Sequence, residues 1–531
     1  MSSPPTARLT DDVRRTPAGA NPLRQAGDAL AKAFEERPTA FFVSVLGLQF
    51  VLWTLLPALF FSNVPLDVVE VISWGREWQL GYYKHPPLQA WLTESALVLS
   101  GGSVWSIYAL SQIAVVLTYL PLFLLGREAA GPKAGLLAVL LFSLVFYANI
   151  PTPEFNPNVL QMPIWGWAAL ALWRGSTRPG LRWWLVLGFV CALAIYAKYS
   201  AVILFAALGA TSLAVSECRR ACRTIGPYVS VAIALALAVP HLQWLRASGF
   251  LPLEYAQHRA GNLQGLNRAT VPIHFFSAQI VDELAPALML LAGGIATRFQ
   301  RSMDDGVGFV SEPGLRRFVV WMAAAPLALT LLFSLITGYG LFDMWGAPML
   351  LWISLAAVLL LKPVYRAGWL VWMLCAWACA FVAMPVLLAV FVVWGPAVGV
   401  RPMRMAFPGE VLAHQLTVIW RNTTGTPLRI VAGDVWPAGV VATYSPDRPS
   451  VFADANMRFS PWIAPQRVAA EGVLIVWGED TPDPPPIAAY QSLGPFTATG
   501  RVSAPYPHAP ARFAFLRWAI SPPGARPSPT K

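Results

Sequence analysis

Residues 40–61 read AFFVSVLGLQFVLWTLLPALFF, a run of 22 residues without a charged side chain. About 20 consecutive apolar residues cross the hydrocarbon of a bilayer as one helix, so this run predicts a membrane span. The rest of the chain has a similar character, because 56% of its 531 residues are hydrophobic and only 12% are charged. A soluble domain carries about 25% charged residues. A water-soluble fold is therefore excluded for most of the chain.

Further apolar blocks recur between short polar stretches rich in Arg, Pro and Gly up to about residue 399. We therefore expect residues 40–399 to form an α-helical polytopic membrane domain of about eleven transmembrane helices. The predicted topology depends most on the turn at Ala197-Lys198-Tyr199. If its two flanking blocks formed one span, every later loop would lie on the other side of the membrane. The predicted spans are 40–61, 104–125, 134–150, 159–173, 183–197, 199–216, 225–244, 276–297, 317–336, 346–361 and 368–394.

The net charge of +11 does not indicate nucleic-acid binding, because the basic residues lie in short loops between apolar blocks, where they set orientation in the membrane. With residues 1–39 as a cytoplasmic tail, alternation of the spans places every basic loop inside. We expect a multi-pass protein of the bacterial inner (plasma) membrane with its N-terminus cytoplasmic and its C-terminus periplasmic. The inside loops carry Arg127, Lys133, Arg174, Arg178, Arg182, Arg219, Arg220, Arg223, Arg298, Arg301, Arg316, Arg317, Lys362 and Arg366.

Residues 400–531 differ in composition, since their apolar runs have the length of strands and are separated by Pro-, Asp- and Ser-rich breaks. Strands are expected at 428–432, 450–453, 473–477 and 512–520. Short helices fit between them, so we predict a small external α/β domain. The five cysteines indicate no disulfide framework and no zinc site.

The first external loop, residues 62–103, gathers ionisable residues close to the bilayer. Asp67 stands out because it follows the first span directly and is flanked by apolar residues, a setting suited to a general base. For Glu77 and Glu94 the polar face of an interfacial amphipathic helix is the favoured explanation. Two such amphipathic stretches are expected, at 67–78 and 88–99.

The segment Gly81-Tyr82-Tyr83-Lys84-His85-Pro86-Pro87-Leu88 is the most specific feature of the chain. Its two prolines fix a rigid turn and begin a helix, while Lys84 and His85 supply groups suited to a phosphate. An ordinary helix start with snorkelling basic residues is the alternative.

An Asp just after the first span, followed fourteen residues later by Gly-Tyr-Tyr-x-His-Pro-Pro-Leu, resembles the glycosyltransferase family 39 and lipid A sugar-transferase group. This group includes the aminoarabinose transferases and is related to the protein O-mannosyltransferases. The resemblance continues through Glu154–Asn158, Ala197–Ser200 and Asp343–Pro348, and so covers the membrane part to about residue 360.

The resemblance implies a GT-C glycosyltransferase that moves a sugar, with inversion, from a polyprenyl-phosphate donor to an acceptor hydroxyl at the outer face of the membrane. The acceptor is lipid A or another envelope glycolipid or glycan. Asp67 takes the catalytic position. The other implied site residues are Lys84, His85, Lys198, Tyr199 and Arg259 for the donor phosphate, and Glu70, Glu154, Asn156 and Asp343 for the sugar or acceptor.

Simpler explanations stay open for several of these residues. Lys198 could snorkel at a helix end, Glu154 and Asn156 could form a plain polar turn, and Asp343 could belong to a turn with an interfacial Trp. The chain also departs from the family. Many relatives have Glu after the first-loop Asp, where this chain has Val68, and some have an acid at the position of Lys84.

No metal and no other cofactor are therefore assigned. The alternative function is a transporter or flippase of lipid-linked sugars, and a third is a scaffold that binds a partner through its C-terminal domain. Transporters usually place ionisable residues within the spans, whereas here they gather in the outer loops, which favours the transferase.

Overall fold

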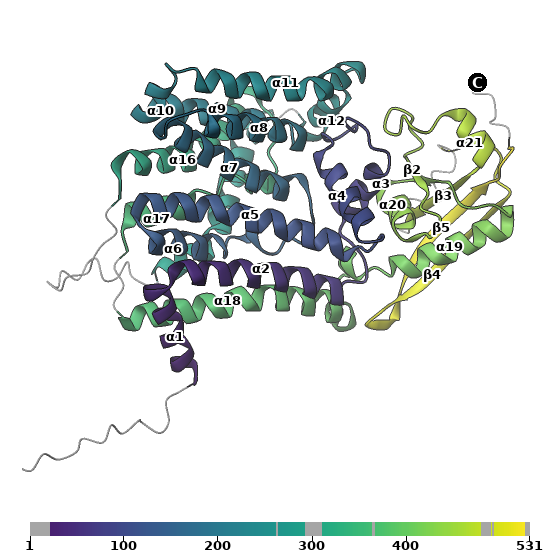
Figure 1. Cartoon of the computed structure of the whole chain (residues 1–531). Helices are drawn as coiled ribbons and strands as arrows, with labels where there is room; N and C mark the ends of the chain where they lie inside the picture. Colours follow the sequence, from purple (N-terminus) through teal and green to yellow (C-terminus); the bar gives the residue numbers. More distant parts are fainter. Residues whose placement is uncertain are drawn as a thin grey trace, which may run out of the picture.

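The computed structural model describes residues 22–261, 264–291, 311–363, 367–478, 490 and 493–525. Long helices lie side by side in a bundle, and a domain built on a β-sheet stands beyond one end of it (Figure 1). The expectations for Arg298, Arg301, Arg366, the end of the 276–297 span and the C-terminal residue Lys531 lie outside the described residues.

The bundle begins with α1, which crosses the end of the bundle opposite the sheet (Figure 1). Its helices are α1 (Pro22–Glu36), α2 (Pro38–Phe60), α3 (Leu66–Gly75), α4 (Leu88–Leu99), α5 (Trp105–Ala130), α6 (Pro132–Phe142), α7 (Pro157–Thr177), α8 (Arg182–Ala197), α9 (Ala201–Ala214), α10 (Ser216–Ala221), α11 (Gly226–Ala247), α12 (Leu251–Ala260), α13 (Asn267–Asp282), α14 (Leu284–Leu290), α16 (Pro313–Thr337), α17 (Ile353–Leu361) and α18 (Ala367–Trp394), with the 3-10 turns η1 (Phe146–Ala148), η3 (Asp343–Gly346), η4 (Gly395–Val398) and η5 (Arg404–Ala406).

Five described helices are long and apolar enough to cross a membrane: Pro38–Phe60, Trp105–Ala130, Gly226–Ala247, Pro313–Thr337 and Gly368–Val398. Pro132–Phe142, Arg182–Ala197 and Ala201–Ala214 are shorter apolar helices. The polytopic helical class is thus confirmed, while the count of eleven spans stays a prediction. The expected break near Lys198 is present, because α8 ends at Ala197 and α9 begins only at Ala201.

Small residues let the helices of the bundle approach closely. A Cβ on Gly126 of α5 would lie 2.5 Å from the Cα of Gly135 on α6, so the two helices pack backbone against backbone. Close contact through glycine is a common way for helices to associate in a membrane, where no hydrophobic effect drives them together.

The two amphipathic stretches of the first loop are helices, as predicted. α4 has the expected bounds, and α3 begins one residue before Asp67 and ends at Gly75. The face of α3 that carries Val68, Val69 and Ile72 is buried in the main core of the protein. This packing fixes the direction of the first turn of α3, which carries Asp67.

The sheet domain consists of helices α19 (Gly409–Thr424), α20 (Val435–Tyr444) and α21 (Pro465–Glu471) around a five-stranded sheet of order β2-β1-β3-β5-β4. The central pairings are parallel, β1 with β2 and with β3, and β5 pairs antiparallel with β3 and β4. The predicted small α/β domain is confirmed. Its strands are β1 (Ile430–Gly433), β2 (Ser450–Ala453), β3 (Val473–Gly478), β4 (Ala498–Tyr506) and β5 (Ala509–Ser521).

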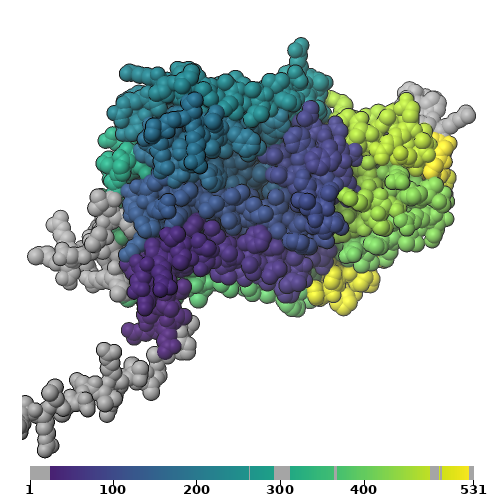
Figure 2. Space-filling view, in the orientation of Figure 1, coloured from purple at the N-terminus to yellow at the C-terminus, as the bar shows by residue number. Residues whose placement is uncertain are grey.

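The sheet domain packs directly on α3 and α4, and Figure 2 shows no gap between them on the visible face. A Cβ on Gly439 of α20 would meet Val69 Cγ1 of α3 at 2.3 Å. Arg448 of the sheet domain forms an ion pair with Glu94 of α4 at 2.9 Å, and Arg76 donates a hydrogen bond of 2.8 Å to the carbonyl of Ala442. The first loop is therefore held between the bundle and the sheet domain.

Candidate active site

Four segments that are distant in sequence meet where the bundle joins the sheet domain. Asp67 comes from the first turn of α3, Lys84 from the turn before α4, Glu154 from the loop before α7, and Lys198 from the break between α8 and α9. The carboxylate of Glu154 accepts a hydrogen bond from the backbone N–H of Asp67 at 2.8 Å. Lys84 and Lys198 both interact electrostatically with Asp67. We call Asp67, Glu70, Lys84, Glu154 and Lys198 the Asp67 cluster.

Asp67 has a free carboxylate at the centre of this cluster. Its side chain is half-buried, and in the described part of the chain no hydrogen bond or ion pair engages its oxygens. Asp67 is thus held through its backbone while its carboxylate stays available to a substrate.

Lys84 is anchored by a buried acid. Its Nζ lies 2.8 Å from Glu70 Oε2, and the Tyr83 hydroxyl donates to the other oxygen of Glu70 at 3.3 Å. Burial would lower the pKa of Lys84, but the carboxylates of Glu70 and Asp67 raise it above its usual value, so the ammonium stays charged. Glu70 is only 4% exposed, which favours a role in orienting Lys84 over direct contact with a sugar.

Among the residues that the structure describes, no acid contacts Lys198 directly. Its Nζ donates to Asn158 Oδ1 at 2.5 Å and lies 5.6 Å from the ring centroid of Trp345. Burial lowers the pKa of Lys198 to about 7, against the opposing effect of Asp67. The Lys198 amine is therefore only partly charged near neutral pH, and an arriving anion would favour its protonated form.

His85 and Tyr199 differ from Lys84 and Lys198 in character. Burial, together with the charges of Lys84 and Lys198, lowers the pKa of His85 well below its usual value, so the imidazole is neutral near pH 7. It can donate a hydrogen bond but adds no positive charge. The Tyr199 ring stacks at 5.8 Å on His241 of α11, and its hydroxyl has no partner among the described residues.

Glu154 and Asn156 share a loop but have different surroundings. Burial raises the pKa of Glu154 to about 7, and the Asp67 carboxylate adds to the rise, while Arg404 and Lys84 oppose it. Asn156 caps α7, because its side chain accepts hydrogen bonds from the N–H groups of Asn158 and Val159. The contacts of Asn156 thus favour the plain structural explanation.

The contacts of Arg259 and Asp343 are with residues outside the Asp67 cluster. The guanidinium carbon of Arg259 stacks 4.7 Å from the ring centroid of Phe342. Asp343, the next residue along, is 3.5 Å from His274. Trp345, in the same 3-10 turn as Asp343, provides the contact with Lys198. No direct contact between Asp343 and the cluster is present in the described part of the chain.

The site also contains residues that the sequence did not single out. Asn158 holds Lys198, Tyr83 holds Glu70, and Arg404 acts on Glu154 from the segment before α19. Two of them carried a signal in the sequence, because Tyr83 belongs to the segment Gly81–Leu88 and Asn158 ends the polar stretch 151–158 and lies in the first turn of α7. Within the described ranges, no group of three or more His, Cys, Asp and Glu side chains is suited to a metal ion.

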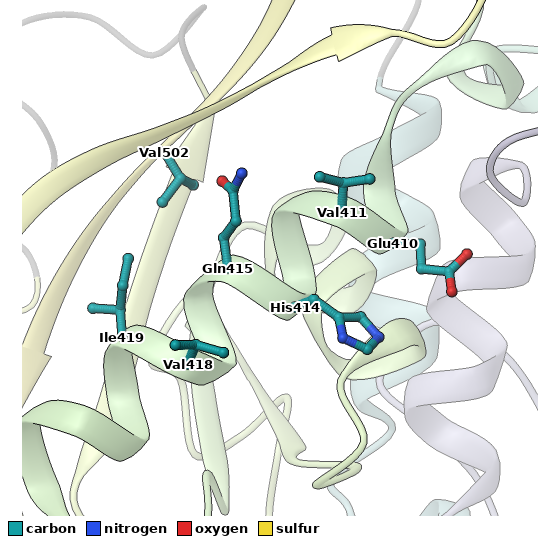
Figure 3. A pocket seen from close by; sticks show the side chains of 7 residues that line it. All are labelled: Glu410, Val411, His414, Gln415, Val418, Ile419 and Val502. Atoms are coloured by element: carbon teal, nitrogen blue, oxygen red, sulfur yellow. The ribbon is translucent and has the colours of Figure 1, made fainter.

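A separate shallow groove lies on the sheet domain between α19 and β4 (Figure 3). It is lined mainly by apolar side chains and shares no residue with the Asp67 cluster, so it is not part of the candidate active site. Its lining residues are Glu410, Val411, His414, Gln415, Val418, Ile419 and Val502.

The chain is a multi-pass membrane protein in which a bundle of apolar helices meets a small α/β domain at a free carboxylate and two lysines. The family model of the dolichyl-phosphate-mannose-protein mannosyltransferases matches residues 84–244. This match includes Lys84, Glu154 and Lys198, and it begins after Asp67.

The lipopolysaccharide core galacturonosyltransferase RgtA of Rhizobium johnstonii is 23% identical over 445 residues, 82% of this chain and 85% of the relative. The lipid A galacturonosyltransferase RgtD of the same organism is 26% identical over 200 residues, 37% of this chain and 42% of the relative. ArnT of Cupriavidus metallidurans, solved with bound undecaprenyl phosphate, has a TM-score of 0.61 at 13% identity and covers 90% of this chain and 98% of its own. These similarities confirm the resemblance to the GT-C group, and the ArnT likeness shows the fold.

Proposed function

We propose that this chain is a glycosyltransferase that moves a sugar from a polyprenyl-phosphate donor to a hydroxyl of lipid A or another envelope glycan. The observation that carries the proposal is the free Asp67 carboxylate beside Lys198 and the Lys84–Glu70 pair. A general base can activate the acceptor hydroxyl, and neighbouring cations can stabilise the phosphate that leaves. The names of RgtA and RgtD support this class of substrate.

In the proposed reaction Asp67 accepts the proton of the acceptor hydroxyl as its oxygen attacks the anomeric carbon of the sugar. The bond from that carbon to the phosphate oxygen breaks at the same time, so the configuration inverts. The polyprenyl phosphate leaves with both electrons of the broken bond. Lys198 and Lys84 stabilise the negative charge that develops on the phosphate.

The other site residues have supporting roles in this proposal. His85, Tyr199 and Arg259 supply further donors near the phosphate, and Glu154 fixes the backbone of Asp67. Asp343 and Asn156 stay candidates for sugar contacts. The expectation that the reaction needs no metal and no cofactor stays a prediction.

A transporter of lipid-linked sugars is the less favoured alternative. The spans α2 and α18 contain no charged residue, whereas a transporter usually carries ionisable groups inside its spans. RgtA and RgtD are named as transferases, and ArnT shares the fold of this chain. None of the three names describes a transporter.

The decisive experiment uses the full chain in lipid nanodiscs, with a sugar-labelled undecaprenyl phosphate and purified lipid A–core glycolipid. We expect the label to appear on the glycolipid, and mass spectrometry should show one added sugar. In sealed proteoliposomes, movement of the labelled donor across the bilayer without transfer would instead support the transporter.

We also propose that the Asp67 cluster faces the periplasm of a bacterial inner membrane. This orientation puts the N-terminus inside, the C-terminus outside and the basic loop Arg219–Arg223 in the cytoplasm. Alkaline phosphatase, which is active only outside the cytoplasm, should be active when fused after Lys531 and inactive when fused at Arg220. The opposite pattern would put Asp67 on the wrong side for a periplasmic acceptor.

A further inference from the structure

Arg404 links the sheet domain to the segment that carries Asp67. Its backbone carbonyl accepts a hydrogen bond of 3.2 Å from Asn63 Nδ2. The carbonyl of Met405 accepts two more, from the N–H groups of Ser62 at 2.9 Å and Asn63 at 3.0 Å. Since Asn63 stands four residues before Asp67, these bonds tie Arg404 to the entry of α3.

The side chain of Arg404 lies over an aromatic ring, and within the described residues its charge is unpaired. Its guanidinium carbon lies 5.3 Å from the ring centroid of Trp436, which packs edge-on against Phe407 at 5.9 Å. Arg404 is exposed, and no carboxylate within the described residues forms an ion pair with it. A guanidinium fixed by stacking presents its N–H groups in one plane, an arrangement that suits a phosphate or a carboxylate.

The positive charge of Arg404 reaches the Asp67 cluster on the side of Glu154, whose carboxylate it stabilises. Glu154 in turn bonds the backbone of Asp67. Lys198 approaches the same Asp67 from the break between α8 and α9, within the bundle. The cluster therefore has two cations from the bundle, Lys84 and Lys198, while Arg404 comes from the segment that leads into the sheet domain.

The positions of these cations matter for the proposed sugar transfer, on which this inference rests. Inversion requires the attacking hydroxyl and the leaving phosphate to lie on opposite faces of the anomeric carbon. If the donor phosphate is held by the lysines of the bundle, the acceptor approaches from the side of the sheet domain. We propose that Arg404, stacked on Trp436, binds an anionic group of the acceptor glycan, either a phosphate or a carboxylate.

The test varies the acceptor concentration at saturating donor, and then the donor at saturating acceptor. Arg404→Gln should raise the KM for an anionic lipid A–core glycolipid about tenfold or more, the usual loss for a hydrogen bond to a charged group. The donor KM should stay unchanged. Arg429→Gln is the matched control, because Arg429 is also exposed on the sheet domain and, within the described ranges, makes no contact with the cluster. We expect it to leave both KM values unchanged.

Two modified acceptors identify the anion. If a phosphate is recognised, removing the phosphates from the glycolipid should raise the wild-type KM to that of Arg404→Gln. If a carboxylate is recognised, reducing the carboxyl groups to alcohols should do so. In either case the variant should no longer differ from the wild type on the matching neutral acceptor.

Arg404→Lys keeps the charge but loses the planar set of guanidinium N–H donors, so we expect a smaller rise in acceptor KM. This variant serves as the readout if Arg404→Gln does not fold. An unchanged acceptor KM in a folded variant, or a rise confined to the donor KM, would overturn the inference. Wild-type protein that transfers no sugar would instead refute the proposed function itself, so the two failures are distinguishable.

Discussion

Asp67→Asn is expected to lower the rate of sugar transfer by roughly 10²–10⁴-fold, the range for loss of a general base. Asn keeps the size of the side chain but does not accept the proton of the acceptor hydroxyl. Folding should be spared, because the described contact of Asp67 with Glu154 uses the backbone N–H, which the variant retains. The measurement is single-turnover transfer from a labelled polyprenyl-phosphate donor, run beside gel filtration of each variant.

Glu70→Gln is the matched control for this experiment. Glu70 lies one helical turn after Asp67 and contacts Lys84 and Tyr83 directly. Loss of its charge should therefore disturb the orientation of Lys84 and cause a smaller fall in transfer than Asp67→Asn. Near wild-type turnover in a well-folded Asp67→Asn protein would show that another group accepts the proton, and the transporter alternative would regain weight.

Much of the fold follows from periodicity and length in the sequence. α3 and α4 are predictable because each is an amphipathic stretch, and α4 starts after the rigid pair Pro86-Pro87. The break around Lys198 is predictable because a lysine is costly inside an apolar helix. Strand β4 is not predictable, since Gly500 and Pro505 both disfavour a strand interior. It forms because it lies at the edge of the sheet, paired only with β5.

The candidate site is predictable in part. Asp67, Lys84 and Lys198 stand at motif positions next to helix boundaries, so the sequence can propose that they act together. The pairings that set their chemistry depend on how the helices pack, and they leave no local pattern. Glu70 neutralises Lys84 at close range while Asn158 leaves the charge of Lys198 free, and only the packing of the helices shows this difference. Arg404 escapes prediction for the same reason, because only the folded chain brings it to Glu154.

Lys198→Met should weaken use of the donor more than loss of any other single cation of the site. Lys84 already has Glu70 at 2.8 Å, whereas the polar and aromatic contacts of Lys198 in the described part of the chain are Asn158 and the ring of Trp345. Loss of a charge-assisted contact costs about 1.5–3 kcal/mol, which corresponds to a fall of roughly 10–150-fold in kcat/KM for the donor. Lys133→Met is the control, since Lys133 pairs with Glu35 at the opposite end of the bundle.

The pH dependence gives this prediction a second, sharper test. In the free protein the pKa of Lys198 is lowered to about 7, so the ammonium is charged below this pH and increasingly neutral above it. A bound phosphate favours the charged form, and donor affinity should therefore fall as the pH rises above about 7. Lys198→Arg keeps its charge at every such pH and should bind the donor with a flatter pH profile. If wild-type and Lys198→Arg profiles coincide and Lys198→Met keeps normal donor kinetics, Lys198 does not bind the phosphate and serves only to join α8 and α9 to Asn158.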